Sequence, residues 1–198
     1  GTSEEYGNVG LRDPINEDQQ LCPTSPYAVS KAAADMMCQV YAKAYGKNIK
    51  ITRAFNHTGP RRGGQFVTKT ICRQAAEIKA GRRDTFKLGT LAAVRDFTHT
   101  DDVCNAYMLA VQERNVINGL PYNVCSGIGH SGADLVAIAC EIAAIGQRPA
   151  ILDPSKLRPL DNLALVGDNS RFRNATGWKP LFTMRGTMES IYRSEAPA

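Results

Sequence analysis

Tyr27 and Lys31 stand four positions apart in the segment Ser25-Pro-Tyr-Ala-Val-Ser-Lys31. On a helix, this spacing places both side chains on one face, within reach of each other. A tyrosine phenol releases its proton only near pH ~10, and a lysine ammonium close to it favours the phenolate. The pair therefore has the chemistry of a general acid or base, although the same pattern also occurs by chance on exposed helix faces.

The helix that must position this pair has clear start and stop signals. Ser25 is a good N-cap, Pro26 suits the first helical position, and Gly46 is a natural C-cap after Tyr45. The first turns contain serine at position 30 and alanines at 28 and 32–34, which leave room for a ligand or a partner helix. We therefore expect a helix over residues 26–45 with a closely approachable face.

Strand and helix patterns alternate along the rest of the chain. Alternating or buried apolar runs predict strands at residues 49–54, 85–88, 95–98 and 122–125. Apolar periodicity and terminal glycines predict helices at residues 66–80, 101–114, 133–145, 168–176 and 183–192, with Asp168 capping the fourth and Asp101 and Asp102 capping the second. Residues 7–24 and 56–65 are expected to be loops, and residues 153–168 a substrate-facing loop. This order favours an α/β protein with a largely parallel sheet.

Composition narrows the class of protein. Of the 198 residues, 43% are hydrophobic and 22% charged, as in an ordinary globular domain, and the net charge is +5. The basic residues are dispersed rather than arranged in a stripe, which argues against a nucleic-acid binder, and no apolar run approaches the ~20 residues of a membrane span. The six cysteines are widely spaced, which argues against a metal site and predicts reduced core thiols in a cytoplasmic protein.

The segment from Ser25 to Lys31 closely resembles the active-site helix of extended short-chain dehydrogenases/reductases, the NAD-dependent epimerase/dehydratase family, which act on nucleotide sugars. Further motifs match in order over essentially the whole chain. The resemblance implies the C-terminal part of a Rossmann-type doubly wound parallel sheet plus a small α/β substrate-binding subdomain. Residues 1–125 would be the rear part of the NAD(P)-binding domain, with substrate segments interleaved at 56–95, and residues 126–198 mainly the substrate-binding subdomain.

The resemblance also implies roles for individual residues. Thr2-Ser-Glu-Glu-Tyr-Gly7 is similar to a family segment in which the hydroxyl of Thr2 contacts the sugar oxygen and completes a Thr–Tyr–Lys centre. Glu4 corresponds to the acid/base that dehydratase members use at C5–C6. Lys31 would hold the cofactor ribose, beside Tyr27.

Two later segments supply the expected binding residues. In Arg53-Ala-Phe-Asn-His-Thr-Gly-Pro-Arg-Arg62, the positions of His57 and Arg62 contact the nicotinamide cofactor in related enzymes, and Asn56 lies against the substrate diphosphate. Arg95, in an Arg-Asp-Phe segment, is expected to grip the same diphosphate, although a salt bridge to a neighbouring aspartate is an alternative. Arg158 is a second candidate for the diphosphate or ribose.

One family feature is not found in this sequence. Members begin with a strand and a G-x-x-G-x-x-G turn that holds the cofactor pyrophosphate at a helix N-terminus, and the glycines at 59, 63 and 64 lie in a different context. We therefore expect that roughly the first hundred residues of a complete member are absent, and that this chain alone binds cofactor poorly.

Several short motifs look most like enzymes that act on GDP-linked sugars. The segments around Asn56, Arg95 and Tyr122 resemble GDP-4-keto-6-deoxy-mannose reductases, whereas Arg61-Arg-Gly and Phe66-Val-Thr resemble GDP-mannose 4,6-dehydratases. We expect a reductase that uses NADP or NAD, with the dehydratase, another nucleotide-sugar epimerase and an inactive binding protein as alternatives. The family also implies a homodimer formed through the Tyr–Lys helix.

Overall fold

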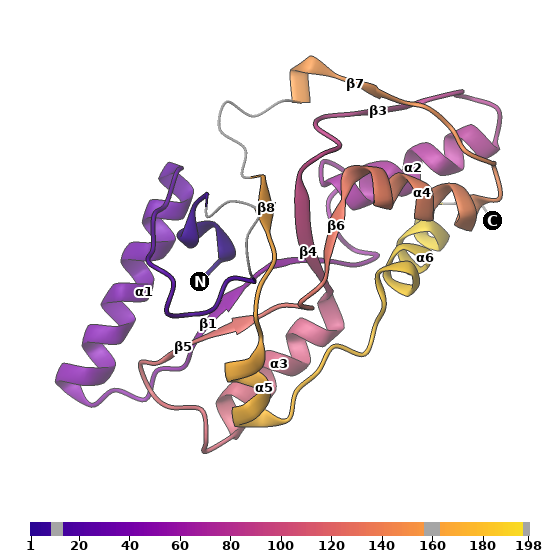
Figure 1. The fold of residues 1–198 in the computed structure, drawn as a ribbon. Coiled ribbons are helices and arrows are strands. Elements are labelled where there is room, and N and C mark those ends of the chain that lie inside the picture. Colours follow the sequence, from indigo (N-terminus) through magenta and orange to yellow (C-terminus); the bar gives the residue numbers. More distant parts are fainter. Residues whose placement is uncertain (9–13, 157–162, 196–198) are drawn as a thin grey trace.

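The computed structural model describes residues 1–8, 14–156 and 163–195. Figure 1 shows the described helices and strands as a mixed α/β arrangement in which α1 lies at one margin and α2, α4 and α6 lie together at the other. The helices are η1 (Ser3–Tyr6), α1 (Pro26–Tyr45), α2 (Val67–Lys79), α3 (Thr100–Gln112), α4 (Gly132–Ala143), η2 (Pro154–Lys156), α5 (Ser170–Thr176) and α6 (Met184–Glu195). The strands are β1 (Ile51–Ala54), β2 (Asn56–Thr58), β3 (Phe86–Leu88), β4 (Val94–His99), β5 (Pro121–Val124), β6 (Gly129–Ser131), β7 (Ala150–Leu152) and β8 (Ala164–Leu165).

Helix α1 has the ends that the sequence predicts. The Ser25 hydroxyl accepts a hydrogen bond from the main-chain N–H of Ala28 at 3.1 Å, and Pro26 begins the helix. Gly46 ends it in the left-handed conformation with φ of 60°, which costs glycine little because it has no Cβ. The helix is therefore fixed at both ends by local chemistry.

The strand pairings are largely parallel, as expected. β1 pairs with β5, β2 with β4, β3 with β7 and β8 with β4 in parallel, and only β6 runs antiparallel to β4 among the described pairs. Thr2 forms an isolated parallel bridge with Ala54, the last residue of β1. The N-terminal segment therefore lies beside the carboxyl end of β1, the end at which open α/β sheets bind ligands.

Three apolar clusters hold these elements together. The largest lies among α2, α4, α6 and β3 and contains Ile71, Leu135 and Met188. A second joins α3, β5 and α5 and includes Phe172 and Trp178. The third surrounds Tyr6 and lies beside the predicted site.

Four short strands were not predicted from the sequence. β2 occupies the start of the expected loop at 56–65, and β8 and the short helix η2 lie within the expected loop at 153–168. β6 and β7 have three residues each. Because segments this short show too few alternations for a period to be recognised, only their pairing with a neighbouring strand defines them.

Two predicted helix caps are wrong. Helix α3 is capped by His99, whose Nδ1 accepts from the Asp101 N–H at 3.1 Å, while Asp102 accepts hydrogen bonds from a distant turn. Helix α5 has Asn169 at its N-cap, although the Asp168 carboxylate still accepts from Ser170 N–H at 2.8 Å.

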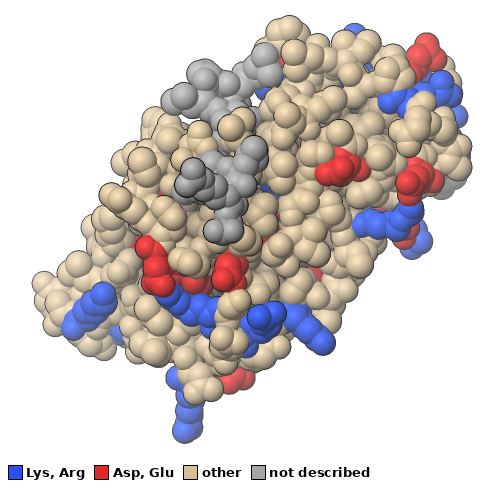
Figure 2. All heavy atoms as spheres, viewed as in Figure 1, with Lys and Arg blue, Asp and Glu red and all other residues tan. Residues whose placement is uncertain are grey.

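The cysteines only partly match the expectation of core thiols. Cys72, Cys125 and Cys140 are buried, but Cys22 and Cys104 are exposed, and none of the six forms a disulfide. No helix within residues 1–8, 14–156 and 163–195 is long and apolar enough to cross a membrane. Figure 2 shows basic and acidic side chains interspersed on one face of the molecule.

Candidate functional site

The first turns of α1 present Tyr27 and Lys31 to solvent. Tyr27 is 53% exposed, and the Lys31 ammonium lies 5.9 Å from the centre of its ring. Both side chains share one helix face, while the intervening Ala28 is fully buried against the protein. The pair is thus accessible to a bound molecule and carries a cation beside the phenol.

The segment containing Thr2 and Glu4 folds into η1, which packs against α1. Thr2 caps this short helix: its hydroxyl accepts from the Glu4 N–H at 3.5 Å, and its own N–H donates to the Glu5 carboxylate at 2.7 Å. Glu4 is half-buried, whereas Glu5 is fully buried. Thr2 therefore lies beside the end of β1 and caps a short helix that packs against α1, the helix that carries Tyr27.

His57 and Arg62 follow β1 and approach the same region. His57 Nδ1 lies 3.2 Å from the Phe55 carbonyl oxygen, and burial lowers the pKa of His57, with the Arg62 charge acting in the same direction. The Arg62 guanidinium lies 3.6 Å from the centre of the Phe66 ring. Burial lowers the pKa of Arg62, opposed by its electrostatic attraction to Tyr27. The loop after β2 therefore brings a second cation toward the Tyr27–Lys31 pair.

Asn56 and Arg95 lie on neighbouring strands. Asn56 pairs with Phe97 across β2 and β4, and Arg95 lies two residues earlier on β4, so the side chains of Asn56 and Arg95 belong to the same sheet face. Arg95 is half-buried, and its guanidinium donates to the Val94 carbonyl at 2.9 Å. Arg158, the other expected contact for the diphosphate or ribose, lies outside the described residues.

Asp96, one of the alternative partners considered for Arg95, makes a different set of contacts. Its fully buried carboxylate accepts hydrogen bonds from the N–H groups of Ser126 and Gly127, both at 2.8 Å, and from the Ser126 hydroxyl at 2.6 Å. It also accepts from Gly167 N–H at 3.3 Å. Asp96 therefore ties β4 to the turn after β5.

Two residues close to the site were not singled out from the sequence. Asp35 is buried on α1, one turn beyond Lys31, and its carboxylate binds the guanidinium of Arg53 on β1 at 2.9 and 3.1 Å. The sequence held a signal for Asp35, because an acidic residue on the alanine-rich face of a helix needs a buried partner. Nothing in the sequence identified that partner as Arg53.

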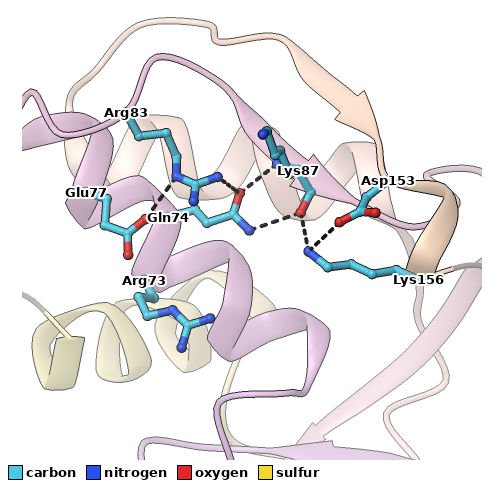
Figure 3. A pocket seen from close by; sticks show the side chains of 7 residues that line it. All are labelled: Arg73, Gln74, Glu77, Arg83, Lys87, Asp153 and Lys156. Carbon is cyan, nitrogen blue, oxygen red and sulfur yellow. Dashed lines mark hydrogen bonds and ion pairs between the residues drawn. The ribbon is translucent and has the colours of Figure 1, made fainter.

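A surface pocket of about 290 Å³ lies between α2, β3 and η2, away from the predicted site residues. Figure 3 shows Gln74 between Arg83 and Lys87: the Gln74 amide donates to the Lys87 carbonyl at 3.0 Å and accepts from the Lys87 N–H at 2.7 Å. The polar atoms of the Gln74 side chain are thus hydrogen-bonded within the protein. The residues that line it are Arg73, Gln74, Glu77, Arg83, Lys87, Asp153 and Lys156.

Comparison with known proteins identifies the family. The family model described as GDP-mannose 4,6 dehydratase matches residues 1–191. The chain belongs to this family.

Within the described part of the chain, no group of three or more histidine, cysteine, aspartate or glutamate side chains is arranged to hold a metal ion.

Relatives in the family include both a reductase and dehydratases. The chain is 32% identical over 192 residues to GDP-6-deoxy-D-mannose reductase of Pseudomonas aeruginosa, covering 96% of this chain and 62% of that protein. It is 33% identical over 181 residues to GDP-mannose 4,6 dehydratase 2 of Arabidopsis thaliana, covering 91% of this chain and 47% of that protein. The chain thus spans about half to two-thirds of the length of these relatives.

Solved structures confirm the Rossmann-type fold. The structure of RMD from Pseudomonas aeruginosa complexed with NADPH superposes with a TM-score of 0.89 at 31% identity, covering 98% of this chain and 64% of that one. The structure of dTDP-glucose 4,6-dehydratase from Bacillus anthracis in complex with NAD gives a TM-score of 0.84 at 22% identity, with 98% and 59% covered. The expected fold class is therefore correct.

Proposed function

We propose that the protein is a nucleotide-sugar oxidoreductase that reduces GDP-4-keto-6-deoxy-mannose with NADPH or NADH. The observation that carries this proposal is the exposed Tyr27 phenol with the Lys31 ammonium 5.9 Å from its ring, beside the Thr2 segment. The similarity to the Pseudomonas reductase over 96% of the chain supports the choice of reaction. We further propose the division into a cofactor domain at residues 1–125 and a mainly substrate-binding subdomain at 126–198.

The cofactor fits the side chains at this site. Lys31 and Arg62 are hydrogen-bond donors near Tyr27, as the ribose hydroxyls and the nicotinamide amide require, and the exposed first turns of α1 leave space for them. The bound cofactor supplies the hydride. Lys31 and Tyr27 would hold its ribose and nicotinamide portion, together with His57 and Arg62 from the segment that follows β1.

The chain's own residues perform the proton transfer and the orientation of the substrate. Tyr27 donates its proton to the oxygen that forms at C4, and the positive charge of Lys31 stabilises the phenolate left behind. Thr2 orients the ketone oxygen from the end of β1. Asn56 and Arg95, on one sheet face, hold the diphosphate with Arg158.

A second candidate, the 4,6-dehydratase reaction, is favoured by the description of the matching family and by Glu4. In this reaction Tyr27 would first accept the C4 hydroxyl proton, and Glu4 would then assist the loss of water across C5–C6. Glu4 lies in η1, one residue before the buried Glu5 and half-buried itself, so its carboxylate is the one in η1 with access to a ligand.

The partner that we propose is a second copy of the chain, bound through α1, in a cytoplasmic protein. Apart from the buried stripe of Ala28, Ala32, Asp35 and Ala42, α1 is exposed, and its exposed residues are strongly apolar. Met36, Met37, Val40 and Tyr41 are between 47% and 61% exposed. A face of this kind marks an interaction surface more often than a solvated one.

The test is turnover by the complete protein with two substrates. Reduction of GDP-4-keto-6-deoxy-mannose with NADPH is expected, whereas turnover of GDP-mannose without added reductant would favour the dehydratase instead. Tyr27→Phe should lower kcat/KM about 10²–10⁴-fold, because it removes the proton donor but keeps the ring. Tyr192→Phe, a change of the same type on α6, should leave kcat/KM unchanged. An active Tyr27→Phe protein would refute the proposed centre.

A further inference from the structure

A buried group of charged and polar side chains lies directly beneath the Thr2 segment. We call Glu5, Tyr6, Asp35 and Arg53 the Arg53 cluster. All four are at least 96% buried. The Arg53 guanidinium makes two hydrogen bonds to Asp35, at 2.9 and 3.1 Å, lies 3.6 Å from the Glu5 carboxylate, and donates to the Tyr6 hydroxyl at 3.1 Å.

The cluster joins the two halves of the proposed catalytic centre. Asp35 lies on α1, four positions after Lys31 and eight after Tyr27. Glu5 lies in η1, and its other carboxylate oxygen accepts the Thr2 N–H at 2.7 Å. Through Arg53, the main chain of Thr2 is thus connected to the helix that carries the Tyr27–Lys31 pair. Figure 1 shows these two segments side by side, with β1 close to both, and η1 and β1 each pack against α1.

The far side of Arg53 is held as well. Its guanidinium also contacts the Glu17 carbonyl at 3.4 Å, and the Tyr6 hydroxyl donates to the Asn123 side chain at 2.7 Å. Asn123 in turn donates its N–H to the Glu17 carboxylate at 2.7 Å. Because its donors are directed at partners on several segments, the guanidinium is restricted to one orientation, which a flexible point charge such as lysine would not reproduce.

The Glu5 carboxylate lies against this arginine. Its Oε2 atom is buried, and no hydrogen-bond donor reaches it among the described residues, so that the guanidinium 3.6 Å away offsets part of its charge. Burying two carboxylates and one guanidinium is costly, and a well-packed apolar group is often as stable. A buried charged group of this kind is therefore better explained by the geometry that it imposes than by stability.

We propose that Arg53 is a positioning residue that fixes Thr2 relative to Tyr27 and Lys31 by bridging η1 and α1. This inference rests on the proposed function. Arg53 itself is 3% exposed and does not reach the solvent-exposed face where Tyr27 lies, so that it acts through Glu5 and Asp35.

The Arg53 cluster also contains a charge, that of Asp35, on the same helix as Tyr27. The charged and titratable groups around Tyr27 are Lys31 on its own helix, Arg62 after β2 and Tyr107 on α3. Asp35 contributes a negative charge from further along α1, and eight residues of helix separate it from Tyr27 by about 12 Å. At an effective dielectric constant of about 20–40, removing that charge should move the alkaline limb of a kcat profile by about 0.5–1 pH unit.

The experiment compares four variants of the complete protein. Arg53→Lys keeps the charge but not the planar fork, Asp35→Asn keeps the shape but not the charge, and Tyr27→Phe tests the centre itself. Arg171→Lys is the matched control, because the ion pairs of Arg171 are with Glu17 and Asp18, at the outer end of the network. The measurements are kcat, KM for the nucleotide sugar, the pH profile of kcat, and the folded fraction from circular dichroism.

We expect Arg53→Lys to lower kcat about 10–100-fold while KM changes less than about threefold, since a misplacement of about 1 Å can cost that much rate and the diphosphate contacts lie on other strands. Asp35→Asn should lower kcat and move its alkaline limb to lower pH, because loss of a negative charge favours the phenolate, which cannot donate a proton. Arg171→Lys should stay within about twofold of the parent protein in kcat.

Several results would overturn the inference. One is a kcat of Arg53→Lys that is within twofold of the parent value or equal to that of Arg171→Lys. Another is a decrease in the kcat of Arg53→Lys that is no larger than its unfolded fraction explains. If Arg53→Lys does not fold, Asp35→Asn is the test instead. A kcat equal to that of the parent, together with an unchanged alkaline limb of the kcat profile, would refute the proposal that Arg53 bridges η1 and α1. An active Tyr27→Phe protein would instead refute the proposed function, whatever Arg53 does.

Discussion

Asp102 links the start of α3 to a turn about eighty residues further along the chain. The residue lies in the first turn of α3 and is 2% exposed. Its two carboxylate oxygens accept the N–H groups of Leu181 and Phe182, each at 3.1 Å, and its carbonyl accepts the Trp178 indole N–H at 3.1 Å. Asp102 therefore fastens the turn that leads into α6 to the start of α3.

The perturbation is Asp102→Asn. The amide retains one oxygen, so that one of the two N–H donors loses its acceptor and meets an NH₂ group instead. A hydrogen bond to a charged acceptor contributes about 1.5–3 kcal/mol, and an unsatisfied buried donor costs about 1–3 kcal/mol. Because Leu181 and Phe182 are 72% and 44% exposed, water can reach part of this turn, and we expect about 1.5–2.5 kcal/mol lost from the free energy of unfolding.

The assay is urea unfolding of the parent protein, Asp102→Asn and the control Asp101→Asn. Asp101 is the neighbouring aspartate in the same helical turn, but its side chain is 68% exposed. Its replacement should cost less than about 0.5–1 kcal/mol, the value of a charge near a helix N-terminus. Equal losses for the two variants, or a loss below about 0.5 kcal/mol for Asp102→Asn, would refute the assignment of Asp102 to a tertiary role.

Two further predictions concern backbone geometry and pH. Gly7 and Gly46 both have positive φ, 69° and 60°. A Cβ added to Gly7 would lie 1.8 Å from the Cys22 carbonyl oxygen, whereas a Cβ added to Gly46 would meet no atom within 4 Å. Gly46→Ala should cost about 1–2 kcal/mol and Gly7→Ala at least twice as much, and similar melting temperatures for the two variants would contradict this. Burial lowers the pKa of His57, so the stability that its neutral form contributes above pH ~6.5 is lost as the pH falls through the folded-state value. From pH 7 to pH 5 the free energy of unfolding of the parent protein should therefore fall more than that of His57→Asn, as measured by urea unfolding at both pH values. The same difference between the two proteins at both pH values would refute this prediction.

Local sequence determined the features that depend on neighbours along the chain. The bounds of α1 follow from Ser25, Pro26 and Gly46, because capping and left-handed glycine conformations involve groups only a few residues apart. The shared face of Tyr27 and Lys31 follows from helical spacing alone. The order of strands and helices likewise indicated an α/β fold with a mostly parallel sheet, which the pairings and the superposed structures confirm.

Tertiary structure decided which polar groups meet. Asp101 and Asp102 look alike in sequence, but only Asp102 faces a turn some eighty residues away. In the same way, Glu4 and Glu5 are adjacent, yet only Glu5 is buried beside Arg53. Burial and ion pairing depend on which segments the fold brings together, and no local pattern encodes that. Tyr27 and Lys31 could thus be found from their spacing, whereas the buried arginine beneath them became visible only when η1, α1 and β1 were placed side by side.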